Sequence, residues 1–171
     1  MAAPAFPHMA PYDIPLFASF LLSDLGRAVQ RWEFDVSVGP GVDPGPYVDP
    51  KVRDNVIYLT QVKIDAVGWV GQIPTIYEVK PDLSLTGFGQ LIGYRWYYQQ
   101  HTGIYAGIAG ITDYMSAQYR ILYDAFQIDV HQVKPATATE VYQATDIVRR
   151  MSGGVIKPTR LIWTGLTDLQ P

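Results

Sequence analysis

An acidic residue and a lysine lie two positions apart in the segment Thr75–Lys80, whose alternating side chains are typical of a β-strand. Glu78 and Lys80 therefore project from the same face of that strand. A single acid, Asp65, interrupts the preceding apolar run at 62–70, and a short turn-like link joins the two runs. Neighbouring strands that each present an acid on one face can hold a divalent cation, and a lysine beside them can orient or activate a water molecule. These residue types at this spacing indicate a phosphodiester-cleaving site.

Regular elements surround this motif and would hold it in place. Helices are expected where apolar residues recur every three or four positions, and strands where apolar and polar residues alternate. In chain order we expect a helix at 16–32, a strand at 33–38, a loop at 39–50, one or two strands within 55–70, a strand at 75–80, a helix at 85–100, a strand at 104–111, a helix at 113–127 with Asp113 as its N-cap, a strand at 128–133, a helix at 139–151 and an edge strand within 155–164. This order predicts a mixed α/β fold.

Composition divides the chain into three parts. Residues 1–15 carry four prolines and predict an extended arm that cannot form a helix. Residues 16–135 hold the expected α/β domain, and residues 136–171 form a C-terminal extension of a helix and a strand. A chain of 171 residues is long enough to bury a real core.

Charge and residue usage limit the classes of function. The net charge of −3 argues against a broad basic surface for unspecific nucleic-acid binding. Residues able to neutralise phosphates are sparse, and the main candidates are Lys63, Arg95, Arg120, Arg149 and Arg150. The chain has no cysteine, which excludes disulfides and zinc–thiolate sites, and its three histidines show no ligand spacing and are expected in loops or solvent.

No apolar run reaches the roughly 18 to 20 residues that a membrane-spanning helix needs. The N-terminal apolar segment at 14–22 is interrupted by Pro15 and Ser19 and lacks a basic leader, so we expect no signal peptide. The expected location is the cytoplasm or a virion.

The motif continues into the helix that follows it. Asp65, then Glu78-Val79-Lys80, then the helical segment Gly89–Tyr94 with Gln90 at its second position, resembles the PD-(D/E)XK nuclease superfamily, which has the restriction-endonuclease-like fold. The resemblance covers about 16–111. It implies a mixed central sheet flanked by helices, in the order α-β-β-β-α-β. Two features depart from the family pattern. Ile64 stands where the family name has proline, and the acid that the family often carries in its first helix would be Asp24 or Glu33.

The resemblance implies a role for each residue of the motif. Asp65 and Glu78 would bind Mg²⁺ or Mn²⁺, with the carbonyl of Val79 as a third ligand. Lys80 would position the nucleophile or stabilise negative charge on the phosphate, and Gln90 would hydrogen-bond water or a DNA phosphate. The alternative interpretation makes Asp65 a strand-edge residue, Glu78 and Lys80 a solvent-facing pair, and Gln90 an exposed polar side chain.

Two functions follow from these features. The first is a Mg²⁺-dependent hydrolase that cuts DNA. The second is a non-catalytic structural or assembly component with the same fold, such as a phage virion protein. The acidic balance favours the second, and so do the arm and the extension, through which we expect a homo-oligomer or a larger assembly. The joint presence of Asp65, Glu78 and Lys80 favours the first.

Overall fold

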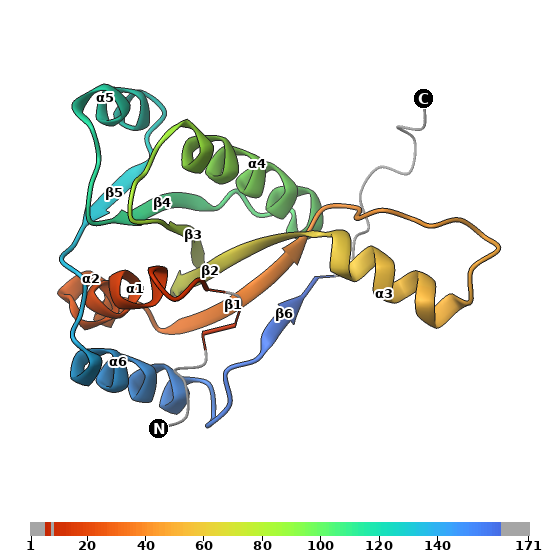
Figure 1. Cartoon of the computed structure of the whole chain (residues 1–171), viewed down its shortest axis with the longest axis horizontal. Helices are drawn as coiled ribbons and strands as arrows, with labels where there is room; N and C mark the ends of the chain where they lie inside the picture. Colours follow the sequence, from red (N-terminus) through yellow and green to blue (C-terminus); the bar gives the residue numbers. More distant parts are fainter. Residues whose placement is uncertain (1–5, 8, 162–171) are drawn as a thin grey trace.

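A six-stranded mixed sheet forms the centre of the computed structural model, which describes residues 6–7 and 9–161 (Figure 1). The strand order is β5-β4-β3-β2-β1-β6. The strands are β1 (Arg31–Val38), β2 (Val62–Val70), β3 (Ile73–Val79), β4 (Gly107–Thr112), β5 (Asp129–Gln132) and β6 (Pro158–Arg160). Strands β1, β2 and β3 are antiparallel neighbours, whereas β4 pairs parallel with β3, β5 with β4, and β6 with β1. The predicted fold class is confirmed.

Helices cover both faces of this sheet. They are α1 (Asp13–Leu22), α2 (Asp24–Ala28), α3 (Pro50–Thr60), α4 (Leu85–Thr102), α5 (Ala117–Ala125) and α6 (Ala138–Met151). Helices α1 and α6 pack on one face, over a buried aromatic cluster that includes Phe17, Trp32 and Phe34. Helix α4 packs on the other face, where Leu91, Tyr98 and the α5 residue Tyr123 are buried. Within the described ranges, no helix combines the length and the apolarity that crossing a bilayer requires.

The hairpin of β2 and β3 has a tighter turn than the sequence suggests. Val70 pairs directly with Ile73, so the turn consists of Gly71 and Gln72 alone. Gly71 has φ +60°, a left-handed conformation that glycine adopts without steric cost.

The N-terminal region forms more helix than its prolines suggest. Helix α1 begins at Asp13, inside the stretch for which we expect no helix, because Pro15 lies in the first turn, where a missing N–H costs nothing. The helix expected at 16–32 is wrong in its second half. The Ser23 side chain accepts a hydrogen bond from the backbone N–H of Gly26 and starts the short helix α2, and the chain enters β1 at Arg31.

The described part of the arm, residues 6–7 and 9–15, packs against its own chain. Phe6 and Met9 are buried in the core, and the Phe6 ring lies 5.3 Å from that of Phe17. The packing of these two residues therefore needs no partner chain.

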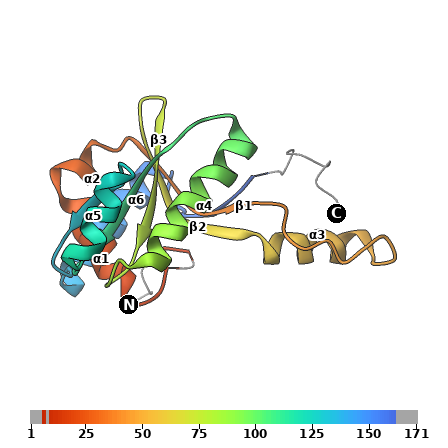
Figure 2. The ribbon, with the colours of Figure 1, turned by 90° about the horizontal axis from the view of Figure 1, so that it is seen from above.

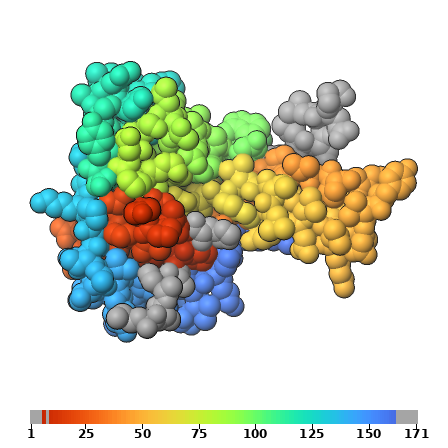
Figure 3. All heavy atoms as spheres, in the orientation of Figure 1, coloured from red at the N-terminus to blue at the C-terminus, as the bar shows by residue number. Residues whose placement is uncertain are grey.

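Residues 55–60, expected in a strand, belong to helix α3. Asp49 caps this helix by accepting hydrogen bonds from the backbone N–H groups of Lys51 and Val52, and Pro50 occupies the first helical position. In the structure as described, no side chain of α3 is buried. The lobe formed by residues 39–60 projects from the body beyond β1 and β2, as Figures 2 and 3 show.

Two predictions about the C-terminal half also differ from the structure. Helix α5 begins at Ala117 with Ser116 as its N-cap, which replaces the expected start at Asp113. The expected edge strand is reduced to β6, which pairs with β1 of its own chain, and residues 162–164 lie outside the described part.

The histidines are not simply exposed. The ring of His131 is half-buried and lies 4.7 Å from that of Phe20. His101 Nε2 accepts a hydrogen bond of 2.8 Å from the backbone N–H of Gly39. The expectation of loop or solvent positions is wrong for these two, and His8 lies outside the described residues.

Candidate active site

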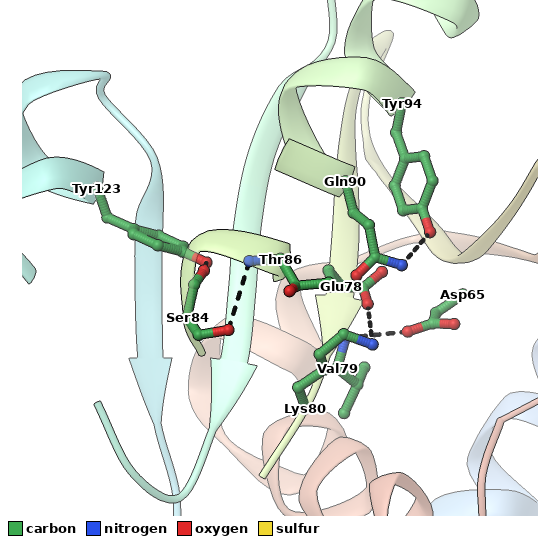
Figure 4. Close-up of polar contacts among 9 residues, drawn as sticks. All are labelled: Asp65, Glu78, Val79, Lys80, Ser84, Thr86, Gln90, Tyr94 and Tyr123. Carbon is green, nitrogen blue, oxygen red and sulfur yellow. Dashed lines mark hydrogen bonds and ion pairs between the residues drawn. The ribbon is translucent and has the colours of Figure 1, made fainter. Parts of the chain in front are cut away.

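Strand register places Asp65 beside Glu78. The last paired residues of the β2–β3 ladder are Ala66 and Tyr77, so the next position brings Asp65 opposite Glu78. Beyond this pair, the Asp65 side chain connects β2 to β3: its Oδ2 accepts a hydrogen bond of 3.0 Å from the backbone N–H of Val79 (Figure 4). One carboxyl oxygen of Asp65 is thus fixed by the sheet.

Glu78 is a buried carboxylate beside a lysine. Its side chain is 1% exposed, and Oε1 lies 2.6 Å from Nζ of Lys80. Its other oxygen, Oε2, is buried and has no hydrogen-bond partner among the described residues. A weak hydrogen-bonding interaction with the Tyr94 hydroxyl lowers the pKa of Glu78, although the hydroxyl does not meet full hydrogen-bond geometry at Oε2. A buried carboxyl oxygen without a donor is costly, so its presence requires an explanation.

Helix α4 brings two polar side chains to the same place. Ser84 caps the helix by accepting from the backbone N–H of Thr86, which fixes the position of the first turns. Gln90 Nε2 donates a hydrogen bond of 2.9 Å to the Tyr94 hydroxyl one turn later, and Gln90 Oε1 is buried without a partner in the described structure. Figure 4 shows the Gln90 carboxamide and the Glu78 carboxylate directed toward each other. Burial and the nearby carboxylates raise the pKa of Tyr94, so its hydroxyl stays protonated.

Burial also changes the acid–base properties of the two carboxyl groups. It raises the pKa of Asp65 to about 8, and repulsion from Glu78 acts in the same direction. Burial raises the pKa of Glu78, against the opposing effect of its bond to Lys80. Burial disfavours the charged form of Lys80, but Glu78 and Asp65 outweigh it and raise the pKa of the ammonium group. Lys80 is therefore a cation that is paired with Glu78 and attracted by the ionised form of Asp65.

A third acid near this site comes from helix α1. Asp13 is half-buried in the first turn, where burial raises its pKa and the charge of Lys80 lowers it. Its charge also raises the pKa of Asp65. Of the two acids expected for the first helix, Asp24 is exposed and Glu33 pairs with Arg31 at 3.4 Å, whereas the charge of Asp13 acts on Asp65, Glu78 and Lys80.

The structure brings Asp65, Glu78, Val79 and Lys80 together at one end of β3, with Gln90 beside them. Over residues 6–7 and 9–161, no three acidic or histidine side chains converge closely enough to enclose a metal ion by themselves. A cation here would therefore rely on two carboxylates, a backbone carbonyl and water molecules.

Comparisons with known proteins give two distant structural likenesses. No protein-family model and no curated protein matches the chain. A repair endonuclease from Pyrococcus abyssi matches over 43% of this chain and 33% of its own, with 14% sequence identity and a TM-score of 0.38. An EndoMS–dsDNA2 complex matches over 78% of this chain and 49% of its own, with 9% identity and a TM-score of 0.45. The chain spans at most about half the length of these proteins.

Proposed function

We propose that this protein is a metal-dependent DNA nuclease of the PD-(D/E)XK type, which hydrolyses phosphodiester bonds. One observation carries the proposal: Asp65 and Glu78 are held side by side with Lys80, although burial raises the pKa of both carboxyl groups and the charge of Glu78 raises that of Asp65 further. Acidic side chains whose surroundings raise their pKa in this way are typical of functional sites. This arrangement contradicts the alternative of a solvent-facing Glu78–Lys80 pair, because Glu78 is buried.

The donor atoms fit Mg²⁺ or Mn²⁺. Both cations prefer oxygen ligands, and Mg²⁺ usually keeps several of its water molecules. Glu78 Oε2, which lacks a partner in the described structure, and the second oxygen of Asp65 would bind the cation together with the carbonyl of Val79. When bound, the cation would polarise the scissile phosphate and lower the pKa of a coordinated water.

The side chains around these ligands would position the reactants. Lys80 is 32% exposed, so its ammonium group can leave Glu78 to orient a water molecule or to stabilise negative charge on the phosphate. Asp13 would hold Lys80 close to the acids. The unpaired carboxamide oxygen of Gln90 could accept a hydrogen bond from the water, with the Tyr94 hydroxyl fixing the amide orientation.

A second candidate is a non-catalytic assembly component, such as a phage virion protein. The projecting lobe at 39–60 favours it, since the described structure buries no side chain of α3. A partner chain could cover that lobe in a homo-oligomer or larger assembly.

A cleavage assay separates the two candidates. Purified protein with Mg²⁺ or Mn²⁺ should cut linear or branched DNA, and Lys80→Ala should abolish cutting while leaving the unfolding temperature close to that of the wild type. Lys134→Ala is the matched control, because Lys134 is exposed and, like Lys80, precedes a proline. Folded wild-type protein that leaves every DNA form intact with either metal would refute the nuclease proposal and favour the assembly candidate.

A further inference from the structure

Two cations share one aromatic ring at the base of the lobe. Lys63 Nζ lies 3.5 Å from the centroid of the Tyr58 ring, and the guanidinium carbon of Arg160 lies 4.8 Å from the same centroid. Tyr58 belongs to α3 and Lys63 to β2, which follow each other in sequence, whereas Arg160 comes from the distant strand β6; the three elements meet where the lobe leaves the sheet (Figure 1). We call Tyr58, Lys63 and Arg160 the cation cluster.

Bringing these two cations together is electrostatically unfavourable. Both positive charges lie over the same ring, and the partial burial of Lys63 reduces the screening of their repulsion by water. The ring offers each cation a favourable π-face, but that interaction does not cancel their repulsion. Within the described chain, neither cation forms an ion pair with a carboxylate, in contrast to Arg53 and Arg150.

Arg160 retains hydrogen-bonding capacity for a ligand. Lys63 donates to the Ser37 hydroxyl and, at 3.0 Å, to the backbone carbonyl of Tyr58. Among the described residues, Arg160 makes one long hydrogen bond of 3.5 Å, to the carbonyl of Asp54, and its side chain is exposed. A guanidinium group has five N–H donors in a geometry that matches phosphate oxygens.

The position of the cluster relates it to the candidate active site. Lys63 lies two residues before Asp65 on β2, which corresponds to about 6.6 Å along a strand. A nucleic-acid strand with one phosphate at Asp65 and Glu78 could therefore continue across the start of β2 toward the lobe.

We propose that Lys63 and Arg160, held on the Tyr58 ring, bind a backbone phosphate of the DNA close to the one that is cleaved. The inference rests on the proposed function for the identity of the ligand. Such a contact orients the duplex and reads no sequence, so its loss weakens binding equally for all sequences.

The salt dependence of DNA binding tests the inference. Affinity for a short fluorescein-labelled duplex is measured by anisotropy in EDTA over a series of salt concentrations, for wild type and Arg160→Gln. Each lost phosphate contact reduces the steepness of log affinity against log salt by about 0.9. When salt rises from 50 to 200 mM, the fold-loss of affinity should therefore be about 3.5 times smaller for the variant than for the wild type. Arg160→Lys should retain most of the wild-type slope. Arg27→Gln, which removes an exposed arginine in α2, should leave it unchanged.

The outcomes distinguish this inference from the nuclease proposal. Wild-type protein that cuts DNA, with an unchanged slope in Arg160→Gln, would overturn the inference and leave the nuclease intact. Protein that cuts nothing but shows the expected change of slope would support the cluster and refute the nuclease. Absence of any DNA binding would overturn the inference. Thermal unfolding of each variant excludes a loss of fold as the cause.

Discussion

The candidate active site and the lobe at 39–60 are held in place by different means. Glu78 is buried in the middle of a sheet, and backbone pairing on both sides of β3 sets its position. Helix α3 has no buried side chain in the described structure and depends on the Asp49 cap, on the Asp43–Arg53 ion pair and on bonds to its last turn. Rigid positioning is thus concentrated where the acids are held together, while the lobe retains exposed surface for a ligand.

The largest expected effect tests whether the two regions differ in packing. Leu91→Ala should lower the free energy of unfolding by about 2–5 kcal/mol, since Leu91 is 0% exposed beneath the site. Leu59→Ala in α3 should change it by less than about 0.5 kcal/mol, since Leu59 is 73% exposed. Chemical denaturation measures both values. Similar losses for the two variants would show that something covers the lobe in solution.

A second prediction concerns the electrostatic cost at the site. The pKa of Asp65 is raised to about 8 in the folded state, from an ordinary value of 3.8, so the folded protein binds this proton more tightly than the unfolded chain does. Stability measured in EDTA should therefore fall as pH rises between about 4 and 8, by at most about 1.4 kcal/mol per pH unit for one proton.

Asp65→Asn should make that decline shallower, because the amide cannot ionise but can still accept the hydrogen bond from Val79. Asp124→Asn, which alters an exposed acid of α5, serves as the control. An unchanged pH profile in Asp65→Asn would show that the acids are not forced together.

The smallest effect should be confined to the lobe. Asp49→Ala removes the cap of α3 and should destabilise that helix by about 1 kcal/mol. Hydrogen exchange should quicken in α3 while protection in β2 and β3 remains that of the wild type. Faster exchange throughout the sheet would mean that the lobe and the site unfold together.

Much of the site could be predicted because strand geometry is local. Side-chain alternation in β3 is sufficient to put Glu78 and Lys80 on one face, and the acid in the preceding run identifies Asp65. The ends of α4 carry sequence signals as well, with Ser84 as N-cap and Gly103 in the left-handed conformation that ends the helix.

The remaining features depend on tertiary packing or on weaker signals. The prolines around Asp13 predict an extended arm, so the sequence does not indicate that Asp13 belongs to a helix near the site. Only the packing of α1 on the sheet brings its charge close to Lys80. The run Val56–Leu59 has the composition of a strand, although Asp49 followed by Pro50 is a typical start of a helix. The burial of Glu78 could not be predicted, because it depends on how α4 covers β3.

The two-residue turn at Gly71 and Gln72 makes the site sensitive to insertions that lie far from the acids themselves. It begins six positions after Asp65, about 20 Å along the strand direction. Insertion of one residue there would slide β3 past β2 by a single step and send the acids to opposite sides of the sheet. Length variation at this turn should therefore separate Asp65 from Glu78, whereas longer loops at 39–49 should be tolerated.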